Sequence, residues 1–176
     1  MELELEVKIL EIDDEYMKER LERVWATAYG AKIMRRYVYD FTPVKIGSWI
    51  RLRDNGQKAT LTIKEIQNDA IDWTKELEIV VDSFDMTHKL LQKLWYQPRA
   101  YQENKRDSYM IGDVHVEIDY RPLIPPYIEV EWPSVEKIQS VVEKLWYTMQ
   151  DTTSINTNKV YMKYWIYLET IENLSF

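Results

Sequence analysis

The sequence has no cysteine, and this absence excludes structural disulfides and thiolate-bound zinc. With only two histidines, His88 and His115, a histidine-rich metal centre is not expected, so a bound metal would have oxygen ligands. No apolar run approaches membrane-spanning length, and the chain shows no signal-peptide pattern. We therefore expect a soluble cytoplasmic protein without a membrane partner.

The charge balance also limits the function. The 176 residues carry a formal net charge of -7, which argues against a general affinity for nucleic acid unless the 23 lysines and arginines are concentrated in one place. No Pro-, Gly- or Ser-rich linker divides the chain, and its length is sufficient for one hydrophobic core. We expect a single domain over residues 1–176.

Hydrophobic periodicity predicts about eight strands and three amphipathic helices. The strands are expected at 3–10, 35–41, 48–54, 58–65, 75–82, 100–112, 113–120 and 126–132, with a hairpin turn at 54–56. The helices are expected at 14–28, at 85–97 and from Ser134, whereas the pattern at 158–168 does not distinguish a strand from a helix. Each of the last two helices is expected to bury one apolar stripe, formed by Leu90, Leu91 and Leu94 in the first and by Ile138, Val141, Val142 and Leu145 in the second. Most connections are too short for parallel crossovers, which predicts a mainly antiparallel α+β fold.

Six of these strands alternate between apolar and charged residues. In LELEVKIL, residues 3–10, Glu4, Glu6 and Lys8 share one face. The other same-face sets are Arg51 and Arg53, Lys58 and Lys64, Glu76 and Glu78, Glu117 and Asp119, and Glu129 and Glu131. The cations occupy two strands and most carboxylates the others. Like charges at this spacing repel each other unless opposite charge lies among them.

Two arrangements account for this pattern. In the first, a twisted sheet packs its apolar face on the helices and exposes its charged face to water. In the second, eight strands close into a barrel with the helices outside, and the charged faces surround a lumen. A lumen with a cationic wall and a carboxylate wall suits a polyphosphate that is bound by Lys and Arg and bridged to the carboxylates by Mg²⁺ or Mn²⁺.

The ordered motifs resemble those of the CYTH superfamily, the triphosphate tunnel metalloenzymes. ELEVK has the Glu-x-Glu-x-Lys signature, and WIRLRDNGQKATLTIKE resembles the family's Arg-x-Arg, turn and Thr-x-Lys hairpin. KELEIVV resembles its acidic strand, KRDSY its Arg-x-x-Tyr segment, VEID its aspartate strand and YIEVEW its second Glu-x-Glu strand. The resemblance implies an eight-stranded antiparallel closed β-barrel, the triphosphate tunnel, with amphipathic helices packed outside.

Position by position, the resemblance implies one set of metal ligands and one set of phosphate contacts. The implied ligands of Mg²⁺ or Mn²⁺ are Glu4, Glu6, Glu129 and Glu131, with Asp119 and Glu78 adding to the acidic wall or positioning water. The implied phosphate contacts are Lys8, Arg51, Arg53, Lys64 and Arg106. The expected catalytic residues are Glu4, Glu6, Lys8 and Asp119.

Several further positions leave alternatives open. Lys105 and Arg106 cannot both face inward, and the resemblance favours Arg106, because its spacing to Tyr109 matches the family's motif. Glu117 fits the inward face by parity, that is, by its place in the two-residue alternation of the strand, but it is equally consistent with an exposed charge. Glu76 and Lys58 also fit by parity, although such residues are more often solvated.

The resemblance implies attack on a phosphorus atom of a bound small-molecule triphosphate or nucleotide. With water as nucleophile, the protein is a triphosphatase acting on inorganic triphosphate, thiamine triphosphate or a nucleotide. With the ribose 3′-hydroxyl of ATP as nucleophile, it is a class IV adenylyl cyclase. A non-catalytic polyphosphate or nucleotide binder is a third alternative, which the retained carboxylate pairs argue against. YVYDFTP departs from the family's Tyr-Phe-Asp-Thr stretch, and a homodimer is left open.

Tryptophan and glycine have an unusual distribution, with seven tryptophans and only four glycines. Trp95 and Trp146 directly follow amphipathic helices, where a left-handed glycine is usual. Trp25, Trp73, Trp132 and Trp165 likewise stand where related sequences tend to have glycine, whereas Trp49 does not. Two interpretations compete: tryptophans that pack on the barrel exterior, or UGA codons that the native host reads as glycine.

Overall fold

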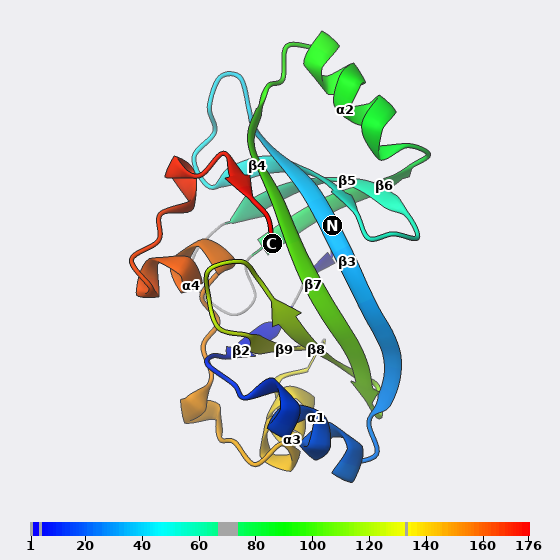
Figure 1. The fold of residues 1–176 in the computed structure, drawn as a ribbon, viewed down its shortest axis with the longest axis vertical. Helices are drawn as coiled ribbons and strands as arrows, with labels where there is room; N and C mark the ends of the chain where they lie inside the picture. Colours follow the sequence, from blue (N-terminus) through cyan, green and yellow to red (C-terminus); the bar gives the residue numbers. More distant parts are fainter. Residues whose placement is uncertain (1, 4, 67–73, 133) are drawn as a thin grey trace.

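A computed structural model describes residues 2–3, 5–66, 74–132 and 134–176 of the chain (Figure 1). The strands are β1 Glu2–Leu3, β2 Glu6–Ile9, β3 Thr27–Asp40, β4 Ser48–Asp54, β5 Ala59–Ile66, β6 Thr74–Val81, β7 Pro98–Ile111, β8 Val114–Tyr120, β9 Tyr127–Glu131 and β10 Asn173–Leu174. The α-helices are α1 Asp14–Arg23, α2 Phe84–Lys93, α3 Val135–Lys144 and α4 Thr157–Lys163. Two short 3₁₀ turns, η1 Met149–Asp151 and η2 Leu168–Thr170, lie in the C-terminal segment.

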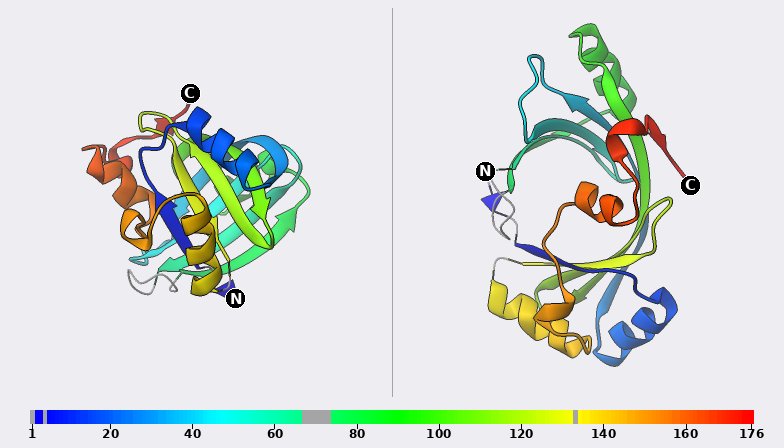
Figure 2. Two further views of the ribbon diagram at one scale, coloured as in Figure 1. Left: turned by 90° about the horizontal axis from the view of Figure 1, so that it is seen from below. Right: turned by 90° about the vertical axis from the view of Figure 1, so that its left-hand side faces the viewer.

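One sheet connects these strands in the order β1-β6-β5-β4-β3-β7-β8-β9-β2, and β10 adds to β7 in parallel. The long strands β3 and β7 pair antiparallel from Thr27 with Met110 to Tyr39 with Pro98 and lie side by side along the molecule (Figure 1). The group β4 to β6 and the group β2, β8 and β9 curve away from this pair, with α4 between the two groups (Figure 2). The predicted antiparallel α+β class is confirmed.

The closure of a barrel is a separate question. The two end strands of the sheet, β1 and β2, are neighbouring pieces of the same N-terminal stretch, and they pair with β6 and β9 respectively. Among the described residues no ladder joins β1 to β2, so hydrogen bonds do not close the sheet. The closed eight-stranded barrel therefore remains a prediction.

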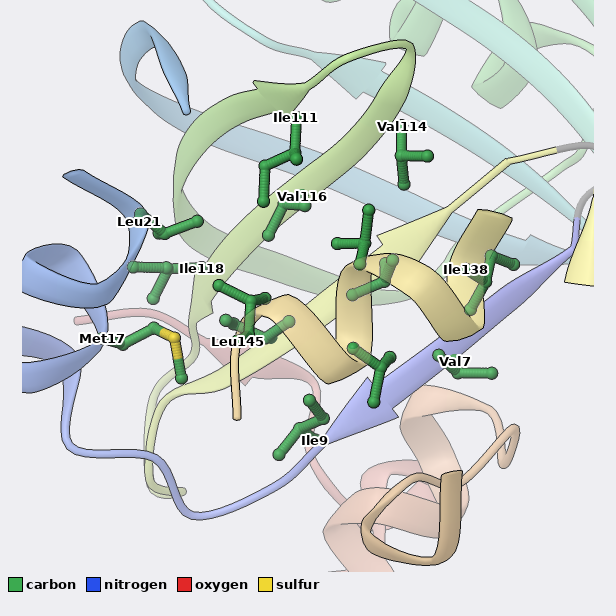
Figure 3. Close-up of a cluster of buried hydrophobic side chains, with 14 of the residues drawn as sticks. Val7, Ile9, Met17, Leu21, Ile111, Val114, Val116, Ile118, Ile138 and Leu145 are labelled. Atoms are coloured by element: carbon green, nitrogen blue, oxygen red, sulfur yellow. The ribbon is translucent and has the colours of Figure 1, made fainter. Parts of the chain in front are cut away.

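Helices α1, α2 and α3 cover the outer, apolar face of the sheet, whereas α4 lies between its two groups of strands (Figure 2). Helices α1 and α3 pack on β2, β8 and β9 through a cluster in which Met17, Leu21 and Leu145 are fully buried (Figure 3). Helix α2 covers β4 and β5 with Phe84 and Leu91. Burying one such side chain contributes about 1.5–3 kcal/mol, so these contacts fix which face of each strand is turned inward.

The ends of the helices differ from the prediction. Asp13 caps α1 by accepting a hydrogen bond from Tyr16 N at 2.9 Å, as expected for an N-terminal Asp. However, the helix predicted at 14–28 ends at Arg23, because Trp25 has a left-handed backbone with φ +58°. The chain then enters β3 at Thr27, well before the predicted strand start at residue 35.

The helical stripes are confirmed in part. In α3, the spacing of Ile138, Val141 and Val142 predicted a buried face, and all three are buried. In α2, the predicted stripe is wrong at Leu90 and Leu94, which are exposed because the helix contacts the sheet through only one narrow face. The undecided segment at 158–168 contains most of α4. No described helix combines the length and the apolarity needed to span a membrane.

Candidate functional site

A cavity of about 1110 Å³ lies on the charged side of the sheet. Its charged lining includes Glu6, Lys8, Arg36, Arg51, Arg53, Lys64, Glu76, Glu78, Arg106, Glu117, Arg121, Glu129 and Glu131. The charged face is therefore not turned to bulk water: Lys8 is 2% exposed and Glu129 is 7% exposed. The alternative of a twisted sheet that exposes its charged face to water is therefore wrong for β2 and β9.

On one side of the cavity, β2, β8 and β9 place carboxylates at paired or nearby positions of adjacent strands. Lys8 is paired with Glu129, and Glu129 with Glu117, in the strand register. The Lys8 ammonium forms an ion pair with Glu6 and lies 3.7 Å from Glu129 Oε1. Arg106, from β7, pairs with Glu117 and has Nη2 2.5 Å from Glu129 Oε2. Two cations thus lie within this group of carboxylates.

Asp119 lies behind this wall and organises it. Its carboxylate accepts hydrogen bonds from Asn104 Nδ2 at 2.7 Å, from Arg106 Nη2 and Arg121 Nη2 at 2.9 Å each, and from the Tyr127 hydroxyl at 3.2 Å. Although burial opposes ionisation, Arg106 and Arg121 hold the pKa of Asp119 well below its usual value. These contacts make Asp119 an ionised anchor for two guanidinium groups.

On the other side of the cavity, β4, β5 and β6 combine cations with carboxylates. Arg51 Nη2 lies 3.6 Å from Glu76 Oε2 and 3.5 Å from Glu78 Oε2. Arg53 Nη2 lies 3.7 Å from Glu78 Oε2, and Lys64 forms an ion pair with Glu76. Both guanidinium groups therefore lie at the cavity beside carboxylates of β6, and a guanidinium group can bind an anion through parallel N–H donors.

The pKa values show that both signs of charge are incompletely compensated. Burial lowers the pKa of Lys8 despite the nearby Glu129. Burial also raises the pKa of Glu117, with Arg106 opposing the change and the carboxylates of Glu129 and Asp119 adding to it. A bound anion near Lys8, or a bound cation near Glu117, would therefore relieve unfavourable electrostatics.

The chemistry of the carboxylates fits a hard divalent cation, since every candidate ligand offers oxygen. Glu6 and Glu131 are direct partners in the register of β2 and β9, and Glu129 follows on the same face of β9. Within residues 2–3, 5–66, 74–132 and 134–176, however, no three acidic or histidine side chains gather closely enough to hold a metal ion. Mg²⁺ commonly uses one or two carboxylates together with substrate phosphates, so the described set suits a shared metal better than a resident one.

The structure brings most of the predicted site residues together. Those lining the cavity are Glu6, Lys8, Arg51, Arg53, Lys64, Glu78, Arg106, Glu129 and Glu131. Asp119 lies next to them but is fully buried, and Glu4 lies outside the described residues. As expected from parity, Arg106 points into the cavity, whereas the Lys105 side chain is 42% exposed.

The predicted separation of cationic and carboxylate walls is wrong. Carboxylates and cations from neighbouring strands contact each other in both halves of the cavity, as in the pairs Lys64 with Glu76 and Arg106 with Glu117. The physical reason is that unpaired charge in a partly buried site is costly. Strand-by-strand parity gives the facing of each side chain but not its partner on the next strand.

Glu117, which the sequence left open, lines the cavity and pairs with Arg106. Three further residues of this region were missed as site residues: Arg36, Asn104 and Arg121. Arg121 is two residues beyond Asp119, but it follows the end of β8, where alternation no longer applies. Arg36 had no signal, since its neighbours on the same face, Met34 and Val38, are apolar.

Comparison with known proteins identifies the family of this chain. The CYTH domain model matches residues 2–161. Comparison with curated proteins finds no match. Among solved structures, a protein from Pyrococcus horikoshii superimposes with a TM-score of 0.74 at 20% identity, covering 87% of this chain and 96% of its own.

Two other similar structures carry functional descriptions. A putative adenylate cyclase from Vibrio parahaemolyticus has a TM-score of 0.75 at 11% identity and covers 92% of this chain and 98% of its own. A Hippeastrum protein, described as a putative adenylyl cyclase with a dominant triphosphatase activity, has a TM-score of 0.64 at 13% identity. It covers 93% of this chain and 96% of its own. At these identities the similarity shows the fold alone.

Proposed function

The chain belongs to the CYTH family, and on this premise we propose that it is a divalent-metal-dependent triphosphatase that binds its substrate in the cavity of the sheet. The observation that carries the proposal is a cavity that brings cations and carboxylates together and in which burial disfavours the charge of both Lys8 and Glu117. A triphosphate with its metal supplies both missing charges at once. The family's similar structures, which include a protein with triphosphatase activity, agree with this assignment.

We assign the phosphate contacts to Lys8, Arg51, Arg53, Lys64 and Arg106. The guanidinium groups of Arg51 and Arg53 can each donate two parallel hydrogen bonds to phosphate oxygens, while Lys8 and Lys64 act as point charges. Lys8 and Lys64 each contact a carboxylate of the adjacent strand, and Arg51 and Arg53 contact Glu78 two strands away, so these cations are positioned before the substrate arrives. Preorganised charge of this kind stabilises the charge that develops in the transition state.

We propose that Glu6, Glu129 and Glu131, with Glu4 as the further predicted ligand outside the described residues, supply one or two carboxylates to a metal shared with the substrate phosphates. Bound Mg²⁺ or Mn²⁺ would supply charge neutralisation of the phosphate oxygens and activation of water. Glu6, whose side chain is 30% exposed, can accept the proton of a water molecule that attacks the phosphorus. The anhydride P–O bond breaks, and the leaving phosphate or diphosphate takes the displaced electron pair.

Asp119 has a different role in this proposal from the one implied by the resemblance. Its oxygens are occupied by four donors, which leaves it poorly placed to bind a metal or to take a proton. We propose that Asp119 positions Arg106 and Arg121. Glu78, which accepts a hydrogen bond from Thr62 Oγ1 at 2.7 Å, similarly supports Arg51 and Arg53.

An organic triphosphate, including ATP, is favoured as substrate by the apolar part of the cavity lining. Trp49, Val38 and Ala100 line the cavity next to Arg51, and in the strand register Val38 is paired with both Arg51 and Ala100. This surface could contact a ring attached to the phosphates. Cyclisation of ATP by its own 3′-hydroxyl is therefore the second candidate function.

The single domain, the cytoplasmic location and the homodimer stay predictions.

The deciding experiment incubates the protein with Mg²⁺ or Mn²⁺ and separately with inorganic triphosphate, thiamine triphosphate and ATP, and then separates the products. Phosphate release supports the triphosphatase, whereas cyclic AMP with pyrophosphate supports the cyclase. Glu6→Gln should lower turnover by about 10²–10⁴-fold. The control Asp113→Asn, at an exposed ion pair with Lys137, should leave turnover unchanged. If the protein binds these compounds but turns none of them over, the proposed catalytic function is refuted in favour of a non-catalytic polyphosphate or nucleotide binder. Turnover that persists in EDTA would refute the metal requirement.

A further inference from the structure

Arg36 is a cation of the cavity whose charge and hydrogen bonds are incompletely satisfied within the described residues. Its Nη2 donates a hydrogen bond to Asn104 Oδ1, a neutral acceptor. Its Nε is buried without a hydrogen-bond partner. In the part of the chain that the structure describes, no carboxylate forms an ion pair with this guanidinium group, although other cavity cations such as Arg106 have several.

The position of Arg36 places it among other guanidinium groups. In the register of β3 it is paired with Arg53 of β4 on one side and with Gln102 of β7 on the other. Burial, and then the nearby charges of Arg121 and Arg51, lower the pKa of Arg36 well below its usual value. A buried cation among like charges is unfavourable unless an anion joins it.

Asn104 explains how Arg36 keeps its orientation in this environment. Its side chain is fully buried, and its Nδ2 donates to Asp119 Oδ1 at 2.7 Å. Because the amide nitrogen is directed to Asp119, the amide oxygen is turned toward Arg36. The carboxylate that anchors Arg106 thereby also orients Arg36, through one amide, while leaving Arg36 Nε free of a hydrogen bond.

We propose that Arg36 is a further substrate-binding residue that contacts a phosphate group of the bound triphosphate, and that Asn104 is its positioning residue. This inference rests on the proposed function and goes beyond it, because Arg36 belongs to none of the motifs that imply the site. The bound phosphate supplies the anion that Arg36 lacks. Charge-assisted hydrogen bonds to a phosphate have the strength needed to offset the burial of the cation.

The test measures the affinity for inorganic triphosphate by calorimetry in the presence of Mg²⁺. Arg36→Gln should weaken binding by about tenfold to a hundredfold, the loss expected for a hydrogen bond to a charged group. The ligand-free variant should melt no lower than the wild type, because the substitution removes a buried charge and keeps an amide that can bond Asn104. Arg36→Lys should bind with intermediate affinity, since the positive charge is kept but the paired N–H donors of the guanidinium group are lost.

Arg35→Gln is the matched control. Arg35 is the adjacent residue of β3, faces the other side of the sheet and pairs with Asp54 at 3.0 Å, so its loss should leave the affinity unchanged. Equal affinity of Arg36→Gln and wild type would overturn this inference alone. A lower melting temperature of ligand-free Arg36→Gln would overturn it in favour of a structural role. Absence of triphosphate binding by the wild type would overturn the proposed function itself.

A second inference comes from the ends of the helices. All four α-helices are followed by a tryptophan with a left-handed backbone: Trp25 with φ +58°, Trp95 with +67°, Trp146 with +62° and Trp165 with +61°. Each closes its helix with the paired backbone hydrogen bonds of a Schellman motif. In α2, for example, Trp95 N donates to Gln92 O at 3.0 Å, and Tyr96 N donates to Leu91 O at 2.9 Å.

This position disfavours tryptophan and suits glycine. The left-handed conformation brings a Cβ atom close to the backbone, whereas glycine adopts it readily. The side chains gain little burial in return, because Trp25, Trp95 and Trp165 are 90%, 87% and 83% exposed. Trp146 is 52% exposed and stacks with Arg20 at 4.9 Å from its ring. Packing therefore does not explain the recurrence.

We propose, independently of any function, that the native protein has glycine at positions 25, 95, 146 and 165, from UGA codons that its host reads as glycine. The chain's four glycines share the left-handed backbone of these tryptophans, with φ between +63° and +91°. The structure gives no such support at Trp132, whose backbone is not left-handed, and Trp73 lies outside the described residues.

The test is peptide mass spectrometry of the protein purified from its native host. Each peptide that covers one of the four positions should be lighter by the mass difference between tryptophan and glycine, while the peptide with Trp49 should keep its tryptophan. Tryptophan at the four positions would overturn the inference. In recombinant protein, the fourfold glycine variant should melt higher than the tryptophan chain, and an equal or lower melting temperature would refute the strain argument. Trp49→Gly, within β4, serves as the control that should melt lower.

Discussion

Asp119 offers the sharpest test of how the cavity is held together. Its carboxylate is fully buried and accepts hydrogen bonds from two guanidinium groups, Arg106 and Arg121. Asp119→Asn keeps the size of the side chain but removes the charge, and it turns an amide N–H₂ toward groups that are themselves donors. Arg121, 6% exposed, would then lose the carboxylate that the structure pairs with it.

The expected loss of stability follows from this geometry. Removing one partner of a buried, hydrogen-bonded ion pair costs about 3–5 kcal/mol, because the remaining charge stays buried. That is a large part of the roughly 5–15 kcal/mol by which a domain is stable. With a urea dependence of about 1–3 kcal/mol per molar, the unfolding midpoint should fall by roughly 2 M.

The assay is urea unfolding followed by tryptophan fluorescence, with Asp113→Asn as the control. Asp113 makes the same kind of pair, with Lys137, on the surface, so the control should unfold like the wild type. The pKa of Asp119 is held below its ordinary value of 3.8, so its contribution is complete above that pH and is lost as the pH falls further. The difference between Asp119→Asn and wild type should therefore be full at pH 7 and shrink below pH 4. Equal midpoints for the two variants at pH 7 would refute the anchoring role.

Three other tests, with four substitutions, concern the packing of helices and side chains outside the cavity. Leu145→Ala, in the buried face of α3, should cost about 2–5 kcal/mol by urea unfolding, whereas Leu90→Ala, at an exposed site, should cost much less; similar losses would contradict the packing. Ser83→Ala removes the cap of α2 and should lower stability by about 1 kcal/mol, with unchanged stability arguing against the cap. Tyr39→Phe removes the 2.7 Å hydrogen bond to His88 Nδ1 and should cost about 0.5–1.5 kcal/mol, and a stabilised variant would contradict that bond.

The secondary structure was largely predictable because its signal is local. Strict alternation placed β4 at residues 48–54, as observed, and the helical spacing of Ile138, Val141 and Val142 placed α3 with its buried face. The end of α1 was not predictable from the printed sequence, because tryptophan at position 25 carries no stop signal. A glycine there would have supplied one.

The sequence predicted those residues of the candidate site that belong to an alternating strand or to a family motif. Side-chain facing has a period of two along a strand, so Lys8 and Arg51 could be placed on the charged side from sequence, whereas Arg106 was preferred to Lys105 because of the family motif. The resemblance to a family then gave them proposed roles. Arg36 and Asn104 lay outside both signals, since neither belongs to an alternating charged set or to a motif.

The sequence by itself determined which face of each strand carries charge and which packs on the helices, because both depend on residues two, three or four positions apart. Only the tertiary structure decided that the charged faces surround a cavity, and which opposite charge each group contacts. Pairs such as Lys8 with Glu129, or Arg36 with Asn104, join strands far apart in the chain. Their formation depends on strand order and register, which no local pattern encodes.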